Sequence, residues 1–137
     1  ASGPATGNVA LVLGEVTFPS PAWNDFVVVI VAAWAAALVR LLHHQSEAER
    51  IHFMEGPYAV VLTRLPAALV RVQAVEGASR ERACVEAGQL ELAQSVLSAG
   101  ESVLQGCRSA EYRSRDTESL EAALLDLRRE ALRLRSR

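Results

Sequence analysis

The longest apolar run of the chain limits its possible folds more than any other feature. Residues 26–39 read FVVVIVAAWAAALV, which is 14 residues without a charge, and Arg40 ends the run. A helix of that composition is hydrophobic on nearly every side, so it must pack against several other elements at once. Because crossing a bilayer takes about 20 such residues, the run predicts a buried element of a globular domain and no membrane partner.

The two halves of this segment favour different local structures. The β-branched sequence VVVIV favours a strand, whereas the following AAWAAALVRLL favours a helix. We expect one helix over residues 24–43, with the side chain of Asn24 or Asp25 capping its start. A short strand at 26–31 that leads into a shorter helix is the alternative.

Several other segments carry strand patterns. Residues 9–18 (VALVLGEVTF) predict one strand, in which Gly14 marks a bulge or a close backbone approach. Residues 51–64 predict a hairpin whose corner is Glu55-Gly56-Pro57-Tyr58. Residues 68–76 alternate apolar and polar side chains, with Arg71 on the polar face, and residues 80–86 predict one more strand.

The last 50 residues predict two helices, at 88–110 and 113–137. Gly100 interrupts the apolar stripe of the first helix, which suggests that another element packs closely there. Asp116 or Thr117 is expected to cap the second helix, with Glu118 in its first turn. The second helix carries an apolar seam that is only two heptads long, so packing within the domain is favoured over a coiled coil. The seam consists of Leu120, Leu124, Leu127, Ala131 and Leu134.

The order of elements predicts an α+β fold. Because the strands come in a run rather than alternating with helices, we expect an antiparallel sheet of four to five strands and three helices, two of them C-terminal. The length of 137 residues fits one domain over residues 1–137. Residues 1–8 are expected to be a disordered segment or a remnant of expression.

Composition argues against several classes of function. The formal net charge is −2, and all 14 basic residues are arginines, so binding of nucleic acid through bulk charge is not expected. Cys84 and Cys107 have no CxxC spacing and are expected to be two buried free thiols of a cytoplasmic protein; one disulfide is the alternative. The absence of lysine suggests a GC-rich, bacterial genome.

No motif for catalysis or cofactor binding is present. His43, His44 and His52 lack the spacing of a metal site, so no metal is expected. The sequence contains no GxSxG elbow, no phosphate-binding loop and no GxGxxG. We therefore expect neither an enzyme nor a cofactor.

The best candidates for a binding site are side chains at two points where the apolar runs of the sequence are interrupted. Trp23 and Asp25 precede the long apolar run, and Glu55 and Tyr58 flank the Gly-Pro corner. An aromatic ring beside a carboxylate on a rigid turn is suited to protein recognition, because tyrosine and tryptophan offer both apolar area and a polar group. The weaker candidates are His52 and Arg71, each on a strand.

Three short motifs carry a resemblance to known proteins. They are EVTFP (15–19), WNDF (23–26) and FMEGPY (53–58). This pattern resembles small α+β proteins of bacteria, similar to the immunity proteins that accompany polymorphic toxins. The resemblance implies a cytoplasmic, non-enzymatic protein that binds and neutralises one cognate toxin.

Two other interpretations remain open. The first is a structural homo-oligomer, for example a homodimer through Leu124 and Leu127 of the last helix. The second is a small-molecule-binding protein with a pocket under the sheet, lined by Trp34, Tyr58 or Phe53.

Overall fold

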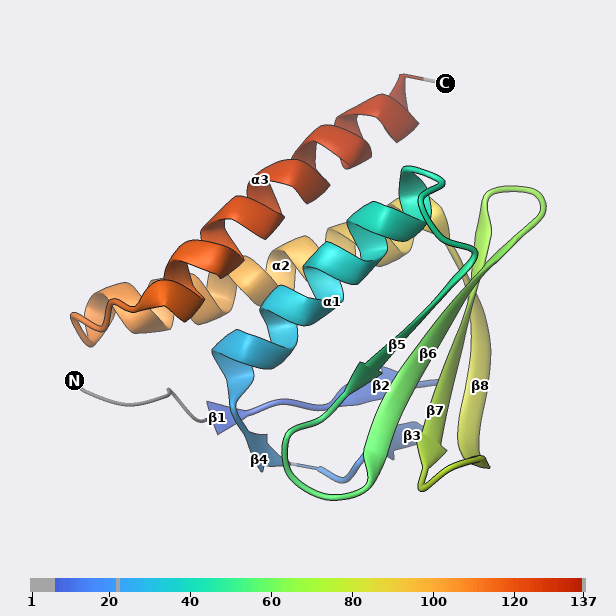
Figure 1. Ribbon diagram of the computed structural model, residues 1–137, viewed down its shortest axis with the longest axis horizontal. Helices are drawn as coiled ribbons and strands as arrows, with labels where there is room; N and C mark the ends of the chain where they lie inside the picture. The colour runs from blue at the N-terminus through green and yellow to red at the C-terminus, as the bar shows by residue number, and fades with distance from the viewer. Residues whose placement is uncertain (1–6, 22, 137) are drawn as a thin grey trace.

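The chain folds into an α+β structure with all three helices on one side of an antiparallel sheet (Figure 1). The computed structural model describes residues 7–21 and 23–136. The sheet has four strands in the order of the sequence, each antiparallel to the next. They are β5 (Ala48–His52), β6 (Tyr58–Leu65), β7 (Leu69–Glu76) and β8 (Arg80–Gly88).

The segment predicted as one strand at 9–18 is instead a hairpin, and this prediction was wrong. Its strands are β2 (Leu11–Leu13) and β3 (Val16–Phe18), joined by a tight turn at Gly14, whose φ is +64°. Apart from Gly14 and its two chain neighbours, no described atom lies within 4 Å of the position that a Cβ on Gly14 would take, so this glycine permits a left-handed turn rather than a bulge or a close approach.

The N-terminal residues contribute one further strand pair. Gly7–Asn8 (β1) pairs antiparallel with Asn24–Asp25 (β4) immediately before the first helix. Residues 1–8 were expected to be disordered or a remnant of expression. Of these, residues 1–6 lie outside the described ranges, while Gly7 and Asn8 are in a strand.

The long apolar run is helical from its second residue. Helix α1 (Val27–Leu42) follows Phe26 directly, so the alternative strand at 26–31 does not form. The expected cap by Asn24 or Asp25 was wrong, because both lie in β4 and Phe26 occupies the N-cap position. The helix lies between the sheet and the other helices, which explains why its apolar residues continue around the axis (Figure 1).

The two C-terminal helices are α2 (Gln89–Ser109) and α3 (Arg115–Arg135). Helix α3 packs on α1 and α2, and its seam residues Leu124 and Leu127 are buried. The seam is therefore used within the chain, as predicted, and Leu124 and Leu127, through which a homodimer was considered, are buried there. Gly100 lies at the crossing of α2 and α3, which confirms the expected close packing.

The cap of α3 was predicted at Asp116 or Thr117, and this prediction was wrong. Ser114 is the N-cap, and its side chain accepts a hydrogen bond from the backbone N–H of Thr117 (3.2 Å). The hydroxyl of Thr117 accepts one from the backbone N–H of Ser114 in return (2.9 Å). Glu118 lies in the first turn, as expected.

The sheet buries one face and leaves the other uncovered (Figure 1). Val70, Val72 and Ala74 of β7 are buried, while Arg71 and Gln73 alternate with them and belong to the opposite face, as the alternation predicts. Cys84 lies opposite Gln73 on β8 and is exposed, so the prediction that both thiols are buried was wrong for this residue. Both cysteines are free.

Two arginines bind the C-terminal carbonyls of α1. Arg64 of β6 donates to the carbonyl oxygen of Leu41 (2.9 Å), and Arg133 of α3 donates to that of Leu42 (3.1 Å). Positive charge at this end complements the helix dipole and satisfies carbonyls that lack a partner within the helix.

The buried carboxylate of Glu130 joins α3 to the end of α1. It accepts hydrogen bonds from Arg133 and from His43 Nδ1 (2.8 Å). Burial alone would raise the pKa of Glu130, but these hydrogen bonds outweigh burial and hold the pKa below its usual value. A carboxylate with a lowered folded pKa contributes stability above its unfolded pKa of about 4.3, and the contribution is lost as the pH falls through the folded pKa.

Glu130→Gln should therefore lower the free energy of unfolding at pH 7 by on the order of 1 kcal/mol and by less at pH 3. Urea denaturation of both proteins at the two pH values measures this difference. Glu121→Gln, at an exposed position of the same helix, is the control and should show little change at either pH. An equal loss of unfolding free energy at pH 7 and pH 3 would show that the ionised form of Glu130 is not what stabilises the fold.

Candidate functional site

The Glu-Gly-Pro-Tyr break lies next to the Trp-Asn-Asp segment, and one buried carboxylate joins them. Asp25 is 1% exposed, and its Oδ2 accepts hydrogen bonds from the indole N–H of Trp23 (3.0 Å) and the backbone N–H of Glu55 (3.0 Å). Its Oδ1 accepts one from the backbone N–H of Phe26 (2.7 Å). Four of the predicted site residues, Trp23, Asp25, Glu55 and Tyr58, therefore meet in one place, which we call the aromatic corner.

The rings of the corner pack edge to face. The ring centroids of Trp23 and Tyr58 are 5.1 Å apart, with an interplanar angle of 84°. The ring of Tyr58 in turn contacts that of Phe18 in the core (5.5 Å between centroids, 89°). Such edge-to-face pairs contribute about 0.5–1.5 kcal/mol each beyond the area that they bury.

Gly56 is required between these rings. Its φ is +74°, and a Cβ at this position would lie 2.8 Å from the ring of Tyr58 and 3.4 Å from that of Trp23. Any other residue would displace the aromatic pair as well as strain the backbone. The hairpin corner predicted between the two strands is therefore confirmed. This corner packs against the segment that contains Trp23.

The corner presents a mixed surface to solvent. The side chains of Trp23 and Tyr58 are partly exposed, and Glu55 is exposed. Met54, the preceding residue, is 57% exposed, which is high for a large apolar side chain. Since Asp25 itself is buried, it holds the corner in place and is not part of its exposed surface.

The two weaker candidates lie outside this cluster. His52 is exposed at the end of β5, where it lines a shallow groove between β5 and α1. Arg71 lies on the uncovered face of the sheet, opposite Thr63 and Glu86. It is five residues along β7 from Glu76, the residue that pairs with Tyr58, which separates it from the corner by roughly 17 Å of strand.

Known proteins give no further guide to this site. No family model, curated protein or solved structure matches the chain. The function must therefore be argued from the geometry of the molecule.

Neither a metal site nor a membrane-crossing helix is found in residues 7–21 and 23–136. In these ranges, no three His, Cys, Asp or Glu side chains converge as metal ligands would. No helix there combines the length and the apolar composition needed to cross a bilayer.

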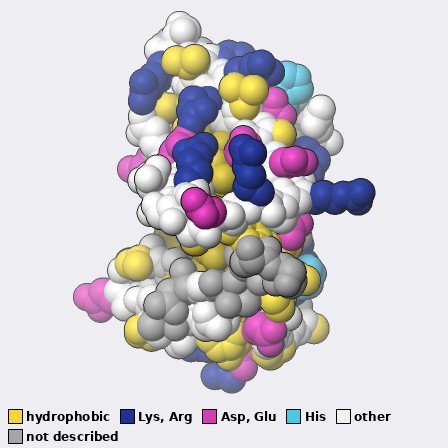
Figure 2. All heavy atoms as spheres, turned by 90° about the vertical axis from the view of Figure 1, so that its left-hand side faces the viewer, with side chains coloured by type: hydrophobic (Ala, Val, Ile, Leu, Met, Phe, Trp, Pro, Cys, Tyr) yellow, Lys and Arg dark blue, Asp and Glu magenta, His cyan; other side chains and the backbone are white. Residues whose placement is uncertain are grey.

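Acidic and basic side chains are interspersed over the helical part of the face seen in Figure 2. Helices α2 and α3 carry ion pairs between Arg128 and Glu101 and between Arg129 and Asp126. No field of a single sign dominates the surface of that part, so long-range attraction of a strongly charged partner to it is weak.

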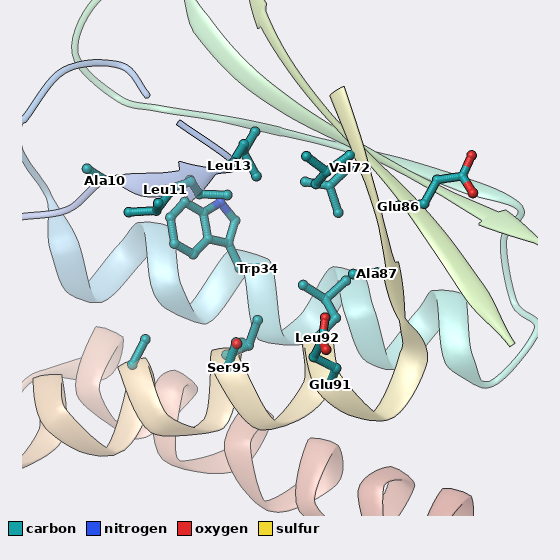
Figure 3. A pocket seen from close by; sticks show the side chains of 15 residues that line it. Ala10, Leu11, Leu13, Trp34, Val72, Glu86, Ala87, Glu91, Leu92 and Ser95 are labelled. Carbon is teal, nitrogen blue, oxygen red and sulfur yellow. The ribbon is translucent and has the colours of Figure 1, made fainter. Parts of the chain in front are cut away.

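A second feature of the structure is an apolar cavity of about 510 Å³. It lies between the β2–β3 hairpin, β8 and α2, with Trp34 of α1 among its lining residues (Figure 3). Of the three aromatic residues expected to line a pocket, Trp34 lines this cavity, whereas Phe53 and Tyr58 are not among its lining residues. The sequence does not predict a part for the hairpin residues Leu11 and Leu13, because its pattern places them in a single strand.

Proposed function

We propose that the chain is a non-catalytic protein-binding module that contacts a protein partner through the aromatic corner. The observation that carries this proposal is the buried carboxylate of Asp25, which accepts three N–H hydrogen bonds from Trp23, Phe26 and Glu55. It fixes the ring of Trp23 and the backbone of Glu55 in one arrangement, and the ring of Tyr58 packs against that of Trp23. A surface that is rigid before binding loses little conformational entropy when a partner docks.

The residue types of the corner are those that dominate protein interfaces. Tryptophan, tyrosine and methionine are enriched at interface centres, where they exclude water from neighbouring polar contacts. Trp23, Tyr58 and Met54 are of these types and each is at least partly exposed. The carboxylate of Glu55 beside them favours a partner with an arginine or lysine at the matching position.

The sharpest form of this proposal is an immunity protein that binds and neutralises a bacterial toxin in the cytoplasm. Its support is the resemblance carried by EVTFP, WNDF and FMEGPY, together with the fact that WNDF and FMEGPY supply the aromatic corner. Residues 1–100 contain nine acidic residues and six arginines, a modest excess of negative charge that suits a basic toxin.

Glu55→Arg should abolish capture of the partner while leaving the fold intact, because the side chain is exposed and only its backbone N–H is bound to Asp25. Reversing one charge at an interface centre costs several kcal/mol when it faces a cation. The test is affinity purification from the source organism with the wild-type chain and the variant as baits, followed by mass spectrometry. Glu15→Arg, an exposed acidic residue in the β2–β3 turn, is the matched control.

The captured protein must then be shown to be neutralised. Expressed alone in a heterologous host, it should stop growth, and co-expression of the wild-type or Glu15→Arg chain should restore growth. Co-expression of Glu55→Arg should fail to do so. A partner that is captured equally by all three baits would show that the aromatic corner is not the binding surface.

A further inference from the structure

Strand β5 is an outer strand of the four-stranded sheet, and its free edge is open. The sheet runs β5-β6-β7-β8, so β5 pairs with β6 on one side only. At the opposite border of the sheet, β8 contacts β2 of the hairpin. Within the described residues, no strand lies along the outer edge of β5 (Figure 1). An open edge of this kind can pair with an extended segment of another chain.

The hydrogen bonds at the two ends of β5 show which of its residues face this edge. Phe53 N–H donates to the carbonyl oxygen of Tyr58 (3.0 Å), and Arg64 N–H donates to that of Glu47 (2.9 Å). Since every second residue of an antiparallel strand bonds to its partner strand, the residues between these two pairs alternate between β6 and the edge. The outward N–H and C=O groups make no hydrogen bond with any described residue. They belong to Ala48, Arg50 and His52.

A shallow groove of about 310 Å³ lies beside this edge, between β5 and α1. On the strand side its lining includes Ile51 and Met54, and on the helix side the small side chains of Ala33 and Ala36 leave space next to the strand. The helical lining begins at Val29 and ends at Arg40. These residues are separated by roughly 16 Å along the helix axis, which is enough for about five residues of an extended strand.

The side chains of β5 give the edge two different sides. Ile51 is 5% exposed and belongs to the face covered by the helices, whereas its neighbours Arg50 and His52 are exposed and belong to the uncovered face. Glu49 is the one acidic residue of β5, and its carboxylate is bound to Arg40 of α1 (2.6 Å). The uncovered side of the edge is therefore basic, and the helix side is mainly apolar.

We propose that the open edge of β5 binds an extended segment of another protein, antiparallel to β5, with acidic residues opposite Arg50 and His52 and an apolar residue opposite Ile51. Residues that are opposite in a sheet share a face, so the acidic side chains lie on the uncovered face and the apolar side chain enters the groove beside Ala33 and Ala36. The antiparallel direction is chosen because it is the more stable pairing per residue.

A second copy of this chain is a poorer occupant of the edge. A twofold pairing that uses all five residues of β5 is centred on Arg50 and places it opposite Arg50 of the other copy. Like charges directly opposite each other destabilise a strand pair. The edge is also separate from the exposed residues of the aromatic corner, so the proposal does not depend on the binding of a partner there.

A synthetic peptide tests the proposal on the full chain. In the capped peptide TEVEVTT, the two glutamates would lie opposite His52 and Arg50, and the first valine would lie opposite Ile51. Its titration, followed by NMR, should move the backbone amide proton resonances of Ala48, Arg50 and His52 downfield, because these N–H groups gain an acceptor. The peptide TKVKVTT places lysines opposite the same residues and should bind about tenfold more weakly.

Two methylated forms of TEVEVTT test the main-chain pairing. Methylation of the backbone nitrogens of both glutamates removes the N–H groups that would donate to β5, so binding should be lost. Methylation of both valine nitrogens is the matched control, because those N–H groups would point away from β5. The control peptide should bind within about threefold of the unmethylated one.

Variants test the charge and the groove. Arg50→Glu should reverse the preference, so that TKVKVTT binds more tightly than TEVEVTT, whereas Arg113→Glu, at an exposed position between α2 and α3, should keep the wild-type preference. Ala33→Phe fills the groove and should weaken binding of TEVEVTT about tenfold. Ala122→Phe makes the same change at an exposed position of α3 and should have no effect.

The proposal is overturned by any of four results. The first is no shift of the three β5 amide resonances with TEVEVTT at millimolar concentration. The second is equal affinity of the wild type for TEVEVTT and TKVKVTT. The third is an equal loss of binding with both methylated peptides. The fourth is a shift of the same resonances with protein concentration alone, which would show that a second copy occupies the edge.

Discussion

Gly100→Ala should destabilise the domain by about 2 kcal/mol, although alanine is the better helix former by about 1 kcal/mol. A Cβ on Gly100 would lie 2.5 Å from Leu124 Cδ2 and 2.7 Å from Cδ1, where no real Cβ contact is found. Leu124 is 1% exposed and cannot turn toward solvent. The added methyl group must therefore separate α2 from α3 or force Leu124 from its rotamer, which costs about 3 kcal/mol in a packed core.

Urea denaturation measures this change, and the chain supplies its own control. Gly106 lies in the same helix and is exposed, and apart from its chain neighbours and the backbone of its own helix, no described atom lies within 4 Å of the position that its Cβ would take. Gly106→Ala should therefore stabilise by about 0.5–1 kcal/mol. In a Leu124→Ala background the clash is absent, and Gly100→Ala should then become stabilising too. Similar effects of Gly100→Ala in both backgrounds would contradict the close crossing.

The periodic features of the sequence were enough to predict most of the fold. The alternation in residues 68–76 placed Arg71 and Gln73 on the uncovered face, and the 4-3-4-3 spacing placed Leu124 and Leu127 in the core. These patterns are reliable because burial of one face is the main source of stability for both strands and helices. The interruption of a helical stripe by Gly100 likewise indicated the helix crossing.

The predictions that failed depended on backbone geometry within a few residues. Gly14 in VALVLGEVTF suits a bulge as well as a turn, and only the pairing of Leu13 with Val16 distinguishes them. The segment Ser-Arg-Asp-Thr offers three capping residues, and the structure selects Ser114 because Thr117 returns a hydrogen bond to it. Local propensities do not separate such alternatives.

The aromatic corner was predictable in its residues but not in its organisation. The sequence draws attention to residues that flank interruptions of its apolar runs, namely Trp23, Asp25, Glu55 and Tyr58. The position of Asp25 before an apolar run predicts a helix cap. Its hydrogen bond to the backbone of Glu55 spans 30 positions, and no sequence pattern indicates it. The cavity was still harder to foresee, because its lining comes from the hairpin, α1, β7, β8 and α2.

The buried carboxylate leads to the second large expected effect. Asp25→Ala should lower the free energy of unfolding by about 3 kcal/mol, because it leaves the N–H groups of Phe26 and Glu55 and the indole of Trp23 without their acceptor. Asp25→Asn should cost less, about 1–2 kcal/mol, since an amide keeps one acceptor oxygen but turns a donor toward another donor. Urea denaturation and the indole N–H resonance of Trp23 measure both effects.

Asn24→Ala is the matched control, since Asn24 is the exposed neighbour of Asp25 in the same short strand, and it should change stability by less than about 0.5 kcal/mol. The contribution of the corner to stability can then be separated from its proposed role in binding a partner. Asp25→Asn should weaken partner capture while the fold persists, because Trp23 and the turn at Glu55 are released from each other. Asp25→Ala with wild-type stability and an unmoved Trp23 resonance would show that packing of Tyr58 alone holds the corner.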